Sequence, residues 1–137
     1  MDGATVAESI RVSRWLITGA GILLVATAAI HAAGYPSVSS TMLASGVNPS
    51  LVAALRALWL MFSVHLVLLA IVVILASNVS GGRRIVLACA LIPAADAALL
   101  LRFVGLFVGT FGLAAATVLL VVGGLLRTKQ ESSRERA

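Results

Sequence analysis

The chain has 137 residues, of which 61% are hydrophobic and 11% are charged, and its formal net charge is +5. Soluble domains contain about 45–50% apolar and about 25% charged residues, so a water-soluble fold of this length could not bury so much apolar surface. The basic residues stand between and beyond apolar runs, as in membrane proteins, and do not suggest a nucleic-acid partner. The composition therefore predicts one domain in a lipid bilayer.

The first predicted span covers residues 15–33, which carry no formal charge and match the roughly 20 residues that cross a bilayer. Basic residues before it and alanines at its end could indicate a signal peptide, but three more spans follow and favour a retained helix. Residues 34–50 contain five serines, two prolines and two glycines, so we expect a connection lying against the membrane surface. Asn48 before Pro49 marks the start of a helix.

The second predicted span covers residues 51–76 and is interrupted by one charge, Arg56. A polar turn over residues 77–84 separates it from the third span.

The third predicted span covers residues 85–101 and contains Pro93, which should kink it because proline lacks a backbone donor. A very short turn at Gly105 leads to the fourth span, residues 106–126. The fold class predicted for residues 1–137 is therefore all-α, a single four-helix integral membrane bundle.

Orientation follows from the distribution of lysine and arginine. The loop 34–50 has neither residue, whereas eight fall on the opposite side: Arg11, Arg14, Arg83, Arg84, Arg127, Lys129, Arg134 and Arg136. The positive-inside rule then places both termini in the cytoplasm. The compact chain, rich in Ala, Val and Arg, indicates a bacterial inner (cell) membrane.

The fourth span carries a stripe of small residues at helical spacing: Gly105, Gly109, Gly112, Ala116 and Gly123. Small residues let membrane helices approach closely. We expect this stripe to pack against the protein's own helices, with a homo-oligomer or a partner membrane subunit as the alternative.

The interior charges predict an ion pair. At about 1.5 Å per residue, Arg56 lies about 8 Å inside the outer boundary of the second span, and Asp96 lies equally deep in the third. Charges inside a bilayer usually have partners, so we expect Arg56 and Asp96 to interact. The pair could also be only a clamp that fixes the helix register.

Further polar residues cluster near the same boundary and predict an outward-facing pocket. It would be lined by His31, Tyr35, Arg56, Trp59, Asp96 and Arg102. Catalytic candidates are Asp96, His31, Arg56 and Tyr35, whereas His31 and Trp59 could equally be interfacial residues. No metal-binding motif such as CxxC or HExxH occurs.

His65 is the weak candidate for cofactor binding. It lies about 13 Å deeper than Arg56 and half a revolution away from it, so we expect it outside the pocket. A buried histidine can be a proton relay, a hydrogen-bond partner or a ligand of haem b. His31 is too far outward to be a second axial ligand for such a haem.

The four-span architecture resembles that of DoxX-like proteins and of membrane epoxide isomerases. The resemblance implies the four-helix fold but no site residue, since Arg56-Ala57-Leu58 lacks a histidine where a haem-binding isomerase would have one.

Three functions remain open. The first is a non-enzymatic accessory or interaction subunit, favoured by the absence of a catalytic motif. The second is a membrane-embedded enzyme, of isomerase or oxidoreductase type, acting on a lipophilic small molecule with Asp96 and a histidine as acid and base and Arg56 stabilising negative charge. A transporter or channel subunit is the third, and it would need oligomerisation because four helices rarely enclose a pathway.

Overall fold

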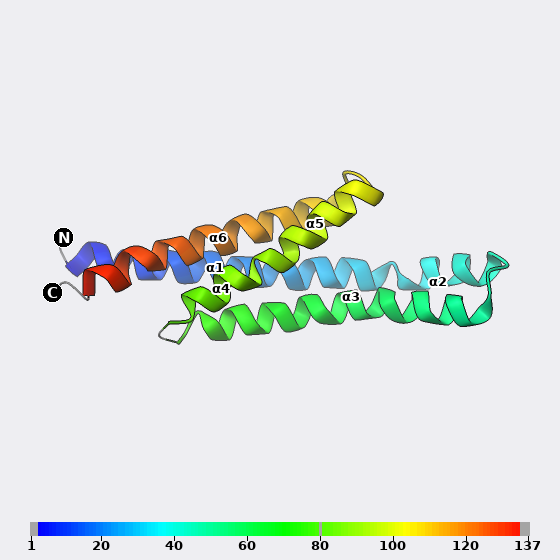
Figure 1. Ribbon diagram of the computed structural model, residues 1–137, viewed down its shortest axis with the longest axis horizontal. Helices are drawn as coiled ribbons and strands as arrows, with labels where there is room; N and C mark the ends of the chain where they lie inside the picture. The colour runs from blue at the N-terminus through cyan, green and yellow to red at the C-terminus, as the bar shows by residue number, and fades with distance from the viewer. Residues whose placement is uncertain (1–2, 80, 135–137) are drawn as a thin grey trace.

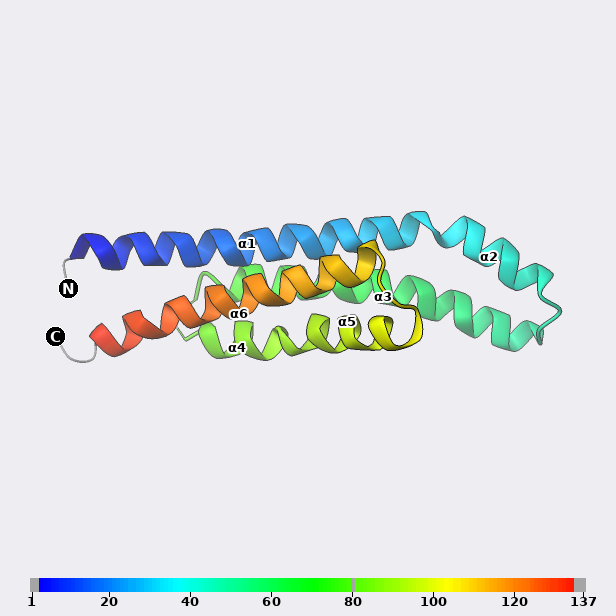
Figure 2. The ribbon, with the colours of Figure 1, turned by 90° about the horizontal axis from the view of Figure 1, so that it is seen from above.

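The computed structural model describes residues 3–79 and 81–134, and the side chains of residues 8–79 and 81–127. The described residues form helices and no strands (Figures 1 and 2). The helices are α1 (Gly3–Ala33), α2 (Tyr35–Ala44), α3 (Pro49–Ala76), α4 (Arg83–Cys89), α5 (Leu91–Phe103) and α6 (Val108–Arg134).

Four apolar stretches are long enough to cross a membrane, as the sequence predicts. They are Glu8–Ala44, Pro49–Ala76, Arg83–Phe103 and Val108–Arg127. Large apolar side chains on their outer faces are exposed, as lipid-facing residues would be; Ile22 is 65% exposed and Leu75 is 63% exposed. The start of α1, the end of α6 and the α3–α4 turn lie at one end of the bundle (Figure 1).

The segment 34–50 differs from its prediction, because most of it is helical. Helix α2 continues from α1 with a slight bend and runs beside the start of α3 (Figure 2). Pro36 occupies the first turn of α2, where a missing backbone donor costs nothing. The hydroxyls of Ser40 and Thr41 donate to the Ser37 carbonyl one turn back, so these residues are accommodated within the helix.

The start of α3 is confirmed. Asn48 caps the helix by accepting a hydrogen bond from the Ser50 amide on Oδ1 at 2.9 Å, and Pro49 is the first helical residue. At the other end, Arg127 donates to the carbonyls of Ala76 and Ser77. This guanidinium satisfies two of the carbonyl groups that a helix C-terminus leaves without partners.

The third span is broken where its proline requires. Helices α4 and α5 are separated at Ala90, and Cys89 is the residue whose carbonyl the Pro93 ring would meet in a straight helix. The turn after α5 is made by Gly105, whose φ of +96° is left-handed and whose amide donates to the Leu100 carbonyl.

Helix α1 is the centre of the bundle. It packs along both α3 and α6, and α5 packs on α6, whereas α3 and α5 diverge toward the α5–α6 turn (Figure 1). The α2–α3 hairpin extends well past that turn (Figure 1). Helices α3 and α5 therefore have no close backbone contact with each other.

Small residues of α6 let it approach α1 closely, as predicted. A Cβ on Gly112 would lie 2.7 Å from the Thr27 hydroxyl, and one on Gly123 would lie 2.9 Å from an Ile17 side-chain carbon. Ser13 donates to the Gly123 carbonyl at 2.7 Å. The prediction of packing within the protein is thus confirmed for this part of the stripe.

The first two glycines of that stripe have other positions. Gly105 lies in the turn before α6, and Gly109 faces the Phe107 ring of its own connection. The GxxxG pattern that they form is therefore not a helix-packing motif here.

Candidate functional site

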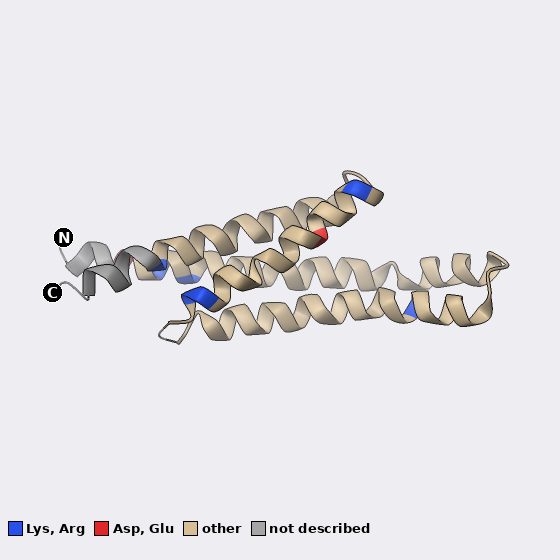
Figure 3. Ribbon diagram, in the orientation of Figure 1, with Lys and Arg blue, Asp and Glu red and all other residues tan. Residues whose placement is uncertain are grey.

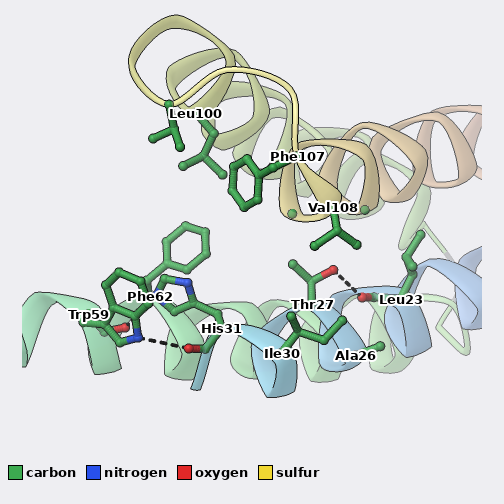
Figure 4. A pocket seen from close by; sticks show the side chains of 13 residues that line it. Leu23, Ala26, Thr27, Ile30, His31, Trp59, Phe62, Leu100, Phe107 and Val108 are labelled. Carbon is green, nitrogen blue, oxygen red and sulfur yellow. Dashed lines mark hydrogen bonds between the residues drawn. The ribbon is translucent and has the colours of Figure 1, made fainter. Parts of the chain in front are cut away.

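A cavity of about 310 Å³ lies where α3 and α5 diverge, between α1, α3, α5 and α6. Its walls are mostly apolar: Leu23, Ala26, Thr27, Ile30, His31, Trp59, Phe62, Leu100, Val104, Phe107, Val108, Gly109 and Gly112. Figure 4 shows His31, Trp59 and Phe62 on one wall and Leu100, Phe107 and Val108 facing them. We call this cavity the lateral pocket.

His31 and Trp59 are locked together at the edge of the lateral pocket. Trp59 Nε1 donates to the His31 carbonyl at 3.0 Å, and His31 Nε2 lies 3.1 Å from the Trp59 carbonyl. A carbonyl only accepts, so His31 carries its hydrogen on Nε2. The two rings also stack, with centroids 4.0 Å apart and planes 15° apart. Both rings are therefore held in fixed orientations.

Phe62 joins this pair to the second histidine. Its ring lies 4.8 Å from that of His31 and meets the His65 ring edge-on at 5.1 Å. A continuous series of ring contacts therefore runs along α3 from Trp59 inward to His65.

His65 and Asp96 form the one contact between a histidine and a carboxylate side chain among the described residues. His65 Nε2 lies 3.1 Å from Asp96 Oδ2, and the two side chains are 34% and 19% exposed. Phe62 and Leu100, which line the lateral pocket, lie one helical turn away from this pair on α3 and α5, toward the end of the bundle that holds the α5–α6 turn. The pair therefore closes the gap between α3 and α5 one turn below the pocket.

The predicted ion pair between Arg56 and Asp96 is wrong. Arg56 Nε donates instead to the Tyr35 hydroxyl at 3.1 Å, with its guanidinium 5.7 Å from the centre of the Tyr35 ring. The depths of Arg56 and Asp96 do not match, because the α2–α3 hairpin projects past α5 (Figures 1 and 3) and Asp96 lies beside His65. His65 is the α3 residue opposite Asp96, nine residues and about 13 Å further in than Arg56.

The predicted outward-facing pocket is divided into separate groups in the structure. His31 and Trp59 line the lateral pocket, Tyr35 and Arg56 pair further out, and Asp96 lies below with His65. Arg102 is exposed, with its guanidinium 5.5 Å from the centre of the Phe103 ring.

The pocket's apolar walls were missed in the sequence because the prediction followed charges. Phe62 and Trp59, three residues apart on α3, share a helix face, and this spacing was a usable signal. Nothing in the sequence indicated that Phe107 would fold back over that face, because its position depends on the Gly105 turn.

The structure offers no observation in favour of a haem. Each histidine already uses Nε2 in a hydrogen bond, His31 with a carbonyl and His65 with a carboxylate. Among residues 8–79 and 81–127, no three His, Cys, Asp or Glu side chains gather as a metal site would need.

In comparisons with family models, with curated proteins and with solved structures, nothing matches this chain.

Proposed function

We propose that the protein crosses the inner membrane of a bacterium four times with both termini in the cytoplasm. Two independent counts support the placement. At about 1.5 Å per residue, 30 Å of hydrocarbon corresponds to roughly 20 residues; counting from Arg14 along α1 reaches Gly34, and counting from Ala76 along α3 reaches Arg56. Tyr35 and Arg56 are hydrogen-bonded at this level, and tyrosine and arginine are common at membrane interfaces.

Within this membrane protein, we propose that the lateral pocket binds a lipophilic small molecule. The observation that carries the proposal is an apolar cavity of about 310 Å³ between α1, α3, α5 and α6. Ligand sites are mostly apolar cavities with a few placed polar groups, and they often lie between the helices of a bundle. Here the placed group is His31, whose Nδ1 is left as a hydrogen-bond acceptor once Nε2 has bonded to Trp59.

The pair below the pocket favours a second candidate function, an enzyme acting on the same ligand. His65 and Asp96 can exchange a proton across their 3.1 Å contact, and a positioned histidine is the commonest acid or base in enzymes. If the pair is only a clamp between α3 and α5, the protein is a non-enzymatic ligand-binding or accessory subunit. Asp96→Asn distinguishes the two: in an enzyme this variant would fold but lose turnover, whereas in a clamp it would affect folding alone.

Tryptophan fluorescence tests the pocket directly. The chain has two tryptophans, and Trp59 alone lines the lateral pocket. In a Trp15→Phe background, titration with a dibrominated fatty acid should quench Trp59 fluorescence and reach saturation. Ala26→Phe fills the pocket from its α1 wall and should weaken this binding at least tenfold.

Ala115→Phe is the matched control, because Ala115 is exposed on α6 and lines none of the cavities described. It should bind the brominated acid as the parent protein does. Quenching that rises without saturation, or that is equal in the Ala26→Phe and Ala115→Phe proteins, would show that Trp59 meets bulk detergent or lipid and not a ligand in a pocket.

A further inference from the structure

A second cavity lies on the outer face of α1, at the basic end of the bundle and far from the lateral pocket. It is a groove of about 420 Å³ lined by Ile10, Arg11, Arg14, Trp15 and Thr18. Side chains three, four and seven residues apart on a helix share one face, so Arg11, Arg14, Trp15 and Thr18 form one stripe. We call this the α1 groove.

No side chain among the described residues neutralises the positive charge of the α1 groove. Arg11 and Arg14 are exposed, and within the described residues neither guanidinium forms an ion pair or a hydrogen bond. Arg127 lies at the same end, but its guanidinium already donates hydrogen bonds to the Ala76 and Ser77 carbonyls. Two free guanidinium groups one turn apart present donors that match a phosphate group.

The groove continues into an apolar stripe along the same helix face. Ile22 and Val25 follow Trp15 at seven and ten residues and are 65% and 44% exposed. Trp15 itself is 71% exposed, as an aromatic anchor at the membrane interface would be. A molecule bound here would meet guanidinium groups at one end, an indole ring next, and hydrocarbon side chains beyond.

We propose that the α1 groove binds the headgroup of an anionic membrane phospholipid. The phosphate would contact Arg11 and Arg14, the glycerol region would lie against Trp15, and an acyl chain would follow Ile22 and Val25. Basic pockets at the cytoplasmic ends of membrane helices are suited to anionic headgroups. The exposed apolar continuation is what selects a lipid over a free phosphate ion, which would need the two arginines alone.

Lipid retention on the purified full-length protein tests the proposal. Protein delipidated in detergent is mixed with phosphatidylglycerol or phosphatidylcholine, and bound lipids are counted by native mass spectrometry. Wild type should retain phosphatidylglycerol over phosphatidylcholine, and Arg11→Gln/Arg14→Gln should retain at least fivefold less phosphatidylglycerol. The matched control Arg84→Gln/Arg102→Gln loses the same charge from exposed positions on α4 and α5 and should retain it as wild type does.

Equal retention of the two lipids, or equal loss in the two double variants, would overturn the proposal, because binding would then follow net charge and not the groove. Displacement of phosphatidylglycerol by excess inorganic phosphate would overturn the lipid as ligand. If the Arg11/Arg14 variant does not fold, Trp15→Leu keeps both charges, and its expected loss of phosphatidylglycerol decides the question; unchanged retention would contradict the proposal.

Discussion

The contact between His65 and Asp96 is the strongest polar interaction that joins α3 to α5. The two helices diverge here and share little other packing, so each group is the main polar partner of the other. Hydrogen bonds between membrane helices contribute on average about 0.6 kcal/mol and at most about 1.7 kcal/mol. We expect a contribution within that range from this 3.1 Å contact.

A double-mutant cycle measures this contact. Asp96→Ala and His65→Ala should each destabilise the protein by about 1 kcal/mol, and the double variant should lose little more than the larger single loss, because the interaction is removed only once. Denaturant unfolding in mixed micelles, followed by circular dichroism, gives the free energies.

The matched control is a second double-mutant cycle, between Arg56 and Asp96. Arg56 contacts Tyr35 and not Asp96, so Arg56→Ala and Asp96→Ala should have additive effects within about 0.5 kcal/mol. Additivity of the His65 and Asp96 substitutions would contradict their contact, and strong coupling of Arg56 with Asp96 would restore the pairing first inferred from the sequence.

The polar residues singled out in the sequence have partners in the structure, but the sequence did not show which of them meet. Asp96, His65, His31 and Arg56 all have polar or aromatic partners in the structure. Pairing by depth failed because it assumed that each helix begins where its apolar run begins. Helix α2 and the first turns of α3 lie beyond the end of α5 (Figure 1), which shifts the register of α3 against α5 by about two and a half turns.

At the level of helices, close contact between α1 and α6 organises the bundle. Ala116 and Leu120 of α6 are fully buried against α1 residues such as Ile17 and Leu24. Between lipid-facing helices there is no hydrophobic driving force, so this contact depends on van der Waals packing that small residues allow.

Gly123→Leu should therefore separate α1 from α6. Its Cβ would lie 2.9 Å from Ile17 and 3.3 Å from the Ser13 carbonyl, and overpacking of a tight contact costs typically 1–3 kcal/mol. Ala115→Leu, an exposed position on the same helix, is the control and should change stability little. Thermal unfolding in detergent compares the two; equal midpoints would show that α6 does not depend on this contact.

The four spans and the break at Pro93 could be predicted because each depends on local signals, namely the length of an apolar run and the chemistry of one residue. The helical state of 35–44 could not. Its serines and threonine indicate a turn when read alone, but within the helix the Ser40 and Thr41 hydroxyls bond to the Ser37 carbonyl. The neighbouring start of α3, which packs against α2, supports that helix.

For the whole molecule, the two hairpins differ in length. The stretch Glu8–Ala44 has 37 residues and would extend about 55 Å, against about 30 Å of hydrocarbon. Arg14, Arg84 and Arg127 belong to α1, α4 and α6, near the end of the bundle that holds the start of α1, the α3–α4 turn and the end of α6 (Figure 1). On the proposed placement, the excess length projects from the opposite face, and α2 with the first turns of α3 stands outside the hydrocarbon core.

Cysteine accessibility tests this arrangement most directly. Cys89 is the only cysteine, so Val47→Cys, Val79→Cys and Val104→Cys in a Cys89→Ala background each present one thiol, at turns where the three valines are 41%, 51% and 66% exposed. In intact cells, a membrane-impermeant maleimide should label Val47→Cys and Val104→Cys, and it should label Val79→Cys only after permeabilisation. Labelling of Val79→Cys from outside, or of Val47→Cys and Val104→Cys from opposite sides, would contradict four crossings with the basic end in the cytoplasm.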